Sequence, residues 1–161
     1  MGKRGTRRGL ISLALLICIG APLAGHAACR EDAVQVKGDW GQAQFSVDVA
    51  DDNEERGQGL MFVESMPQSA GMLFIYEHPQ TTRFWMKNTL ISLDMIFADE
   101  TGTVQKVHEN AVPLSERLIN GGREIQYVLE VNGGIAARFG IGPGDVLRHP
   151  GIGQDAAAWP C

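Results

Sequence analysis

The sequence predicts a mainly β fold, a compact single-domain β sandwich or barrel of about seven to nine short strands with one or two short helices. Two observations carry this prediction. Short runs of residues alternate between apolar and polar side chains with a period of two, which is the pattern of half-buried strands. Turn-forming residues separate these runs at intervals of roughly ten residues. Since the chain shows no internal repeat, we expect one domain.

The segment 34–49 shows the clearest alternation. Apolar side chains recur at every second position, and in the second half Gln44, Ser46 and Asp48 stand between them. The four residues 38–41, Gly-Asp-Trp-Gly, interrupt the pattern with residues that favour a tight turn. The pattern predicts that the folded domain begins with a β-hairpin.

A short connector helix is expected next. The segment 51–55 supplies capping and acidic residues that favour a helix N-terminus, whereas Gly57 and Gly59 predict an early end. A second short helix is expected within 134–139, and the segment 151–161 is predicted to be an extended C-terminal tail. Further strands are expected at 71–76, 82–86, 91–97, 104–108, 125–131 and 146–148, with turns at 77–79, 99–102, 120–122 and 142–145.

The first residues predict export. Four basic residues precede an apolar run from Leu10 to Leu23, and small residues lead to Ala28. This pattern is typical of a signal peptide at residues 1–27, which leaves a domain at 28–150 and the tail in the periplasm or otherwise outside the cytoplasm. The export route stays open, because the twin arginines at 7–8 also fit a twin-arginine signal. Lipidation of Cys29 is a minor alternative.

The charge of the domain limits the classes of partner that we expect, and its cysteines predict a disulfide. Removal of residues 1–27 discards four of 14 basic residues and none of 19 acidic ones, so ten basic residues face 19 acidic ones and the net charge is −9. Such a domain repels phosphate backbones, so we expect no nucleic-acid partner, and no segment after Ala28 could span a membrane. Cys29 and Cys161 are expected to form a disulfide between the two ends.

Six segments carry a resemblance to a known family. They are Arg56-Gly-Gln-Gly-Leu-Met-Phe, Gly71-Met-Leu-Phe, Phe84-Trp-Met-Lys-Asn-Thr-Leu, Leu93-Asp-Met-Ile-Phe, Glu109-Asn-Ala-Val-Pro and Val128-Leu-Glu-Val-Asn-Gly-Gly. In this order they resemble a bacterial and archaeal family known as domain of unknown function 192. The resemblance covers about 45–148 and implies a small, mainly β, sandwich-like domain that is often exported. It implies no particular activity.

A cluster of polar residues gives the candidate ligand site. Its predicted members are Arg56, Trp85, Lys87, Asn88 and Asp94. In a strand over 82–86, Arg83 and Trp85 share one face, and a tryptophan beside cations can stack on a sugar ring or hold a carboxylate. We expect Lys87 and Arg56 to hold the anion and Asn88 and Asp94 to orient it. The alternative is structural: Trp85 packs under a loop, and Arg56 pairs with Asp94 or Glu55.

Metals and cofactors are not expected. The five methionines after residue 28 stand in apolar runs, where thioethers fill gaps in a core. His78, His108 and His149 are spread over different segments without ligand spacing. The sequence predicts neither a metal site nor a cofactor.

The sequence favours a non-enzymatic binding or accessory domain for a small polar or anionic ligand, such as a carbohydrate. One alternative is a hydrolase or lyase for an envelope carbohydrate or peptide, with Asp94, Glu109 and Glu130 as candidate acids and bases. No nucleophile elbow, internal cysteine or phosphate-binding loop supports it. The other alternative is an assembly factor for envelope proteins, whose sign would be an exposed apolar patch near Trp40 or Trp159.

Overall fold

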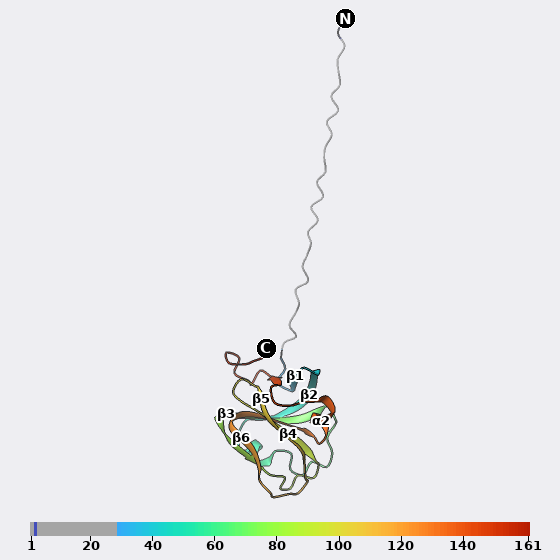
Figure 1. Cartoon of the computed structure of the whole chain (residues 1–161), viewed down its shortest axis with the longest axis vertical. Coiled ribbons are helices and arrows are strands. Elements are labelled where there is room, and N and C mark those ends of the chain that lie inside the picture. The colour runs from blue at the N-terminus through green and yellow to red at the C-terminus, as the bar shows by residue number, and fades with distance from the viewer. Residues whose placement is uncertain (1, 3–28) are drawn as a thin grey trace.

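The computed structural model describes Gly2 and residues 29–161, so the predicted signal peptide lies outside the described residues except for Gly2. The described chain forms one seven-stranded sheet with two short helices. Figure 1 shows how the sheet curls. The predicted fold class is therefore confirmed. No helix in the described part of the chain is long and apolar enough to cross a bilayer.

The sheet has a simple connectivity. Its strands are β1 (Ala33–Gly38), β2 (Gly41–Ala50), β3 (Ala70–Phe84), β4 (Leu93–Ala98), β5 (Val104–Ala111), β6 (Ile119–Asn132) and β7 (Val146–Arg148). They lie in the order β5-β4-β6-β3-β2-β1-β7, and only β2 and β3 pair in parallel. A parallel pair needs a crossover, which the segment containing α1 (Asn53–Gln58) supplies. The second helix, α2 (Ile135–Phe139), follows β6.

The two edges of the sheet meet at one end. The amide of Val104 donates to the carbonyl of Asp145 at 2.8 Å, and the amide of Leu147 donates to the carbonyl of Gly102 at 2.8 Å. These bonds and the bridge between Thr103 and Val146 tie β7 to the start of β5. The sheet is a half-barrel whose edge strands are partly paired, which limits edge-to-edge aggregation.

Each face of the sheet carries its own apolar cluster. The inner cluster contains residues from all seven strands, among them Val36, Phe45, Leu129 and Leu147. From β5 its only buried residue is the first, Val104. The outer cluster contains Phe74, Met86 and Met95, and it lies under the loops on either side of β3. Successive residues of a strand point to opposite faces, so β4 serves both clusters and is buried along its whole length.

Two predicted turns are absent. The segment 77–79 was expected to break the chain between two strands, and it instead lies inside β3. Likewise 120–122 lies inside β6. The reason is tertiary: β3 and β6 pair with each other along their length, and the register shifts between Ile75 and Arg83 absorb the irregular residues. A proline is tolerated at such a point because its missing N–H is not needed by a regular ladder.

The ends of the described domain are joined. Cys29 and Cys161 form a disulfide with their Cα atoms 5.6 Å apart and a sequence separation of 132. The segment 151–161 makes turns, and its Ile152 is buried in the inner cluster. Both ends therefore lie on the same side of the half-barrel.

Candidate functional site

A cavity of about 200 Å³ opens on the outer face of the sheet, and we call it the outer-face cavity. It lies between the end of α1, the loop that follows it, and strands β3 and β6. Its polar and aromatic lining side chains include Arg56, Tyr76, Arg83, Trp85 and Glu130. Leu60, Phe74 and Phe84 of the outer cluster also line it.

Trp85 is held at the rim of this cavity. It follows the last residue of β3, and 43% of its surface is exposed. The next residue, Met86, is fully buried in the outer cluster and donates its amide to the carbonyl of Ser115 at 2.8 Å. The Lys87 ammonium lies 5.0 Å from the centre of the indole ring. Burial of Met86 therefore anchors the backbone and leaves the indole available to a ligand.

Arg56 is positioned by α1. Asp52 caps this helix, because its carboxylate accepts from the amides of Glu54 and Glu55 at 2.8 Å. The Arg56 guanidinium donates to the carbonyls of Asp51 and Ile75 and to the side chain of Asn53. Three of its five N–H groups are thus used within the described residues. Two remain to meet a ligand, and they are held in place.

Glu130 is the unusual group of the cavity. It lies on β6 opposite Met72 and Met95, and only 4% of its surface is exposed. Burial raises the pKa of Glu130 to about 8. No side chain among the described residues forms an ion pair with it. Glu130 is therefore mostly protonated at neutral pH, and a protonated carboxyl can donate a hydrogen bond.

Tyr76 lies between Arg56 and Glu130. The Arg56 guanidinium carbon is 5.2 Å from the centre of the tyrosine ring. Burial raises the pKa of Tyr76, which keeps its hydroxyl protonated and able to donate. The cavity thus combines aromatic faces, cations and two neutral donors.

Asp94 lies on the other face of the sheet. Its carboxylate is fully buried and accepts from the amide of Asn110 at 2.7 Å and from the amide of Ala136 at 2.8 Å. Because Asp94 pairs with Val131 and its neighbour Met95 pairs with Glu130, the two acids point to opposite faces. Asp94 joins β5 to α2 and does not line the outer-face cavity.

Lys87 and Asn88 lie next to the cavity without lining it. Asn88 has a left-handed backbone with φ of 57°, and its carbonyl accepts from the amide of Phe62 at 2.8 Å. Its side-chain amide points to the sulfur of Met61 at 3.9 Å. Of the five predicted ligand residues, the structure brings Arg56 and Trp85 into one cavity, places Lys87 and Asn88 beside it, and separates Asp94 from it.

The sequence segment 34–149 matches the model of a family named DUF192, which is described as "Uncharacterized ACR". The chain belongs to the DUF192 family. The resemblance predicted from six segments of this domain is confirmed. No curated protein matches this DUF192 protein.

Two solved structures are similar to this DUF192 protein. A protein of unknown function from Novosphingobium aromaticivorans DSM 12444 is 39% identical, with a TM-score of 0.70, over 71% of this chain and 82% of its own. A protein from Sinorhizobium meliloti 1021, described as a candidate transcription regulator, is 38% identical, with a TM-score of 0.73, over 80% of this chain and 100% of its own. These likenesses support the fold and leave the activity open.

The candidate catalytic acids do not converge in this DUF192 domain. Glu130 lies in the outer-face cavity, Asp94 lies on the opposite face, and Glu109 is exposed on β5. The arrangement offers no pair of carboxyl groups that could share acid and base roles. Across residues 29–161, no group of three histidine, cysteine or acidic side chains is placed to hold a metal ion.

Sequence reasoning did not connect Tyr76 and Glu130 with the ligand site. Glu130 carried a usable signal, since it stands between Leu129 and Val131 in an apolar strand, at a position that faces a core. A charged residue at such a position needs either a partner or a function. Tyr76 gave no comparable signal, because tyrosine is common in strands.

Proposed function

We propose that this DUF192 protein is an exported, periplasmic binding domain that holds a small anionic or polar ligand, such as an acidic sugar, in the outer-face cavity. One observation carries the proposal: an exposed indole, two arginines and a buried, protonated acid line the same cavity. Convergence of a few polar groups with aromatic and apolar side chains in one cavity is typical of a small-molecule site.

The indole of Trp85 supplies the stacking surface. An exposed aromatic plane at a cavity rim can cover the apolar face of a sugar ring. The free N–H groups of Arg56, together with Arg83 at the rim, attract a carboxylate. Because backbone carbonyls already fix the Arg56 guanidinium, little side-chain entropy is lost when a ligand binds.

Glu130 suits an anionic ligand because it is protonated. An ionised glutamate at this depth would repel a carboxylate, whereas the protonated form donates to it. A nucleic acid is not the ligand that we propose. The chain has 19 acidic and 14 basic residues, and the cavity is small for a polymer.

Calorimetric titration with D-glucuronate tests the proposal, with D-glucose and acetate as probes that keep only the ring or only the charge. We expect glucuronate to bind more tightly than either. Trp85→Ala should weaken the binding of glucuronate by roughly tenfold or more, as expected for the loss of an aromatic contact. The far-UV circular dichroism should stay unchanged, because Trp85 lies at the surface.

Phe62→Ala is the matched control. Phe62 is also an exposed aromatic residue, with 67% of its surface accessible, and it does not line the cavity. Binding should be unaffected by this change. No binding of any of the three probes, or equal losses in the two variants, would count against the outer-face cavity as the site.

A further inference from the structure

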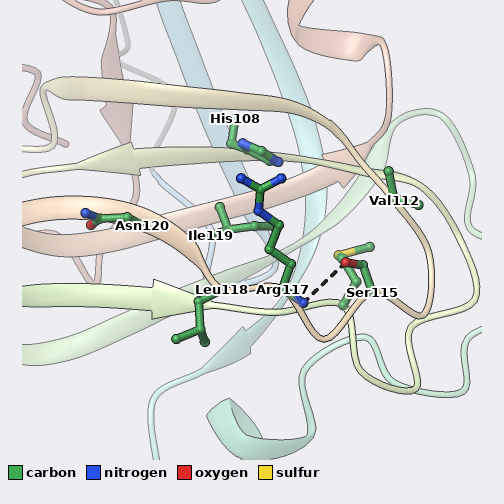
Figure 2. Close-up of a pocket in the computed structure, with 8 residues that line it drawn as sticks. His108, Val112, Ser115, Arg117, Leu118, Ile119 and Asn120 are labelled. Atoms are coloured by element: carbon green, nitrogen blue, oxygen red, sulfur yellow. Dashed lines mark hydrogen bonds between the residues drawn. The ribbon is translucent and has the colours of Figure 1, made fainter.

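A second cavity, of about 360 Å³, opens elsewhere on the outer face, and we call it the β5 cavity. Figure 2 shows that its side chains come from β5, from the segment 112–118 and from the start of β6. Its volume falls within the range of known small-molecule pockets, roughly 300–1,000 Å³. The function proposed above does not use this cavity.

One wall of the β5 cavity is apolar. Met86 is fully buried and forms part of the lining, together with Ile119. Val112 and Leu118 also line the cavity while 67% and 61% of their surfaces are exposed. Large apolar side chains with this exposure are costly in water unless something covers them. The wall is therefore suited to an apolar chain.

The same cavity carries two basic side chains. Arg117 and His108 line it from opposite sides, and Figure 2 shows the Arg117 guanidinium extending toward the His108 ring. In the part of the chain that the structure describes, the Arg117 side chain has no hydrogen-bond or ion-pair partner; its backbone amide bonds to Ser115. None of the eight lining residues is acidic. An anion would complement these two groups.

The walls are fixed in place before a ligand arrives. The segment 112–118 is tied to the segment after β3, because Met86 donates its amide to Ser115 and Leu114 donates its amide to Thr89 at 3.0 Å. Leu114 adopts a left-handed backbone with φ of 61°, a conformation that residues other than glycine rarely adopt unless the surrounding structure holds them in it. A preformed cavity loses little entropy on binding.

From this combination we infer that the β5 cavity binds a free, single-chain anionic amphiphile of the fatty-acid class. The carboxylate lies between Arg117 and His108. The alkyl chain lies along the apolar lining residues Met86, Val112 and Ile119. An arginine favours a carboxylate because its planar fork can donate two parallel hydrogen bonds. Burial of the alkyl chain supplies the remaining affinity, because each CH₂ group removed from water stabilises the complex.

Calorimetric titration of the purified protein with decanoate tests this inference, with 1-decanol and propanoate as probes that lack the charge or the chain. Decanoate should bind more tightly than both. Arg117→Gln should weaken decanoate binding by roughly ten- to a hundredfold, as expected for the loss of a charge-assisted hydrogen bond. The binding of 1-decanol should not change in this variant.

Arg123→Gln is the matched control, because Arg123 is exposed on β6 and does not line the cavity. It should leave decanoate binding intact, while Val112→Ser should weaken both decanoate and 1-decanol, because Val112 is an exposed apolar residue of the lining. Equal affinity for decanoate and 1-decanol, no binding of decanoate, or equal effects of Arg117→Gln and Arg123→Gln would overturn the inference. The inference would also be overturned if the protein bound no decanoate and instead self-associated in a way that Leu118→Ser abolishes. The surface would then be an interface between copies of this chain.

Discussion

Asp94 and Glu130 lie on paired strands and are both buried, but their surroundings differ. Asp94 faces the inner cluster and accepts two backbone hydrogen bonds. Glu130 faces the outer cluster, lines a cavity, and has a pKa raised to about 8 by burial alone. Burial by itself therefore does not identify a functional acid. The supply of hydrogen-bond donors decides whether the acid stabilises the fold or stays available to a ligand.

The position of each acid in the sheet explains the difference. Asp94 lies beside a register shift in the pairing of β4 with β5, and near the first turn of α2. Irregular strand pairing and the first turn of a helix both leave backbone N–H groups without regular partners. Glu130 lies in the regular part of β6, where the neighbouring strands β3 and β4 already use the backbone N–H groups.

The largest expected effect is at Asp94. Asp94→Asn should lower the free energy of unfolding by roughly 3–5 kcal/mol, because an amide cannot accept from both backbone N–H groups as a carboxylate does. Urea denaturation measures this change. Asp48→Asn, on the exposed side of β2, is the control and should change stability little. Similar small effects in both variants would remove the distinction between the two acids.

Substitution of Glu130 should change the free energy of unfolding in the opposite direction. The folded protein keeps the Glu130 proton up to about pH 8, whereas an ordinary glutamate releases it near 4.5, so the folded state binds more protons between these values. The free energy of unfolding therefore falls as the pH rises through this window, by about 1.4 kcal/mol per unit. Glu130→Gln should remove this loss and raise the stability by about 3 kcal/mol at pH 7.

Urea denaturation at several pH values between 4.5 and 8 tests this slope. Glu109→Gln serves as the control, because Glu109 is exposed and should leave the slope unchanged. A Glu130→Gln variant with the wild-type pH dependence would mean that Glu130 is ionised in the folded protein, and the contrast with Asp94 would disappear.

A substitution of Arg56 measures how much its hydrogen bonds stabilise the structure around the outer-face cavity. Arg56→Gln should lower the free energy of unfolding by about 1–2 kcal/mol, because the bonds to the carbonyls of Asp51 and Ile75 are lost. Thermal denaturation gives the size of the loss. Arg83→Gln, at the exposed rim of the same cavity, should cost much less. Equal costs at both arginines would show that Arg56 does not hold the cavity together.

The smallest effect is expected at Lys87. Lys87→Gln should cost about 0.5 kcal/mol, because a half-buried ammonium over an indole at the protein surface contributes little. A double-mutant cycle with Trp85→Leu isolates this contact. A coupling several times larger would place Lys87 and Trp85 in one rigid unit and would strengthen the case for Lys87 as a ligand contact.

The sequence by itself determined the mainly β class, the first hairpin and both short helices. These features depend on neighbouring residues, namely the alternation of 34–49, the caps around α1 and the glycines that end it. The alternation of the sequence around Trp85 also correctly placed the Trp85 side chain at the surface and the Met86 side chain in a core. Six local motifs were enough for the DUF192 family.

Only the tertiary structure decided what depends on distant residues. The pairing of β3 with β6 overrode the turn chemistry of 77–79 and 120–122, because a continuous ladder satisfies more backbone groups than two interrupted ones. The register between β4 and β6 placed Asp94 and Glu130 on different faces. The tertiary arrangement of α1, β3 and β6 gathered Arg56, Tyr76, Trp85 and Glu130 into one cavity. Which donors reach a buried acid is set by strands and helices far away in sequence, so no local pattern could reveal it.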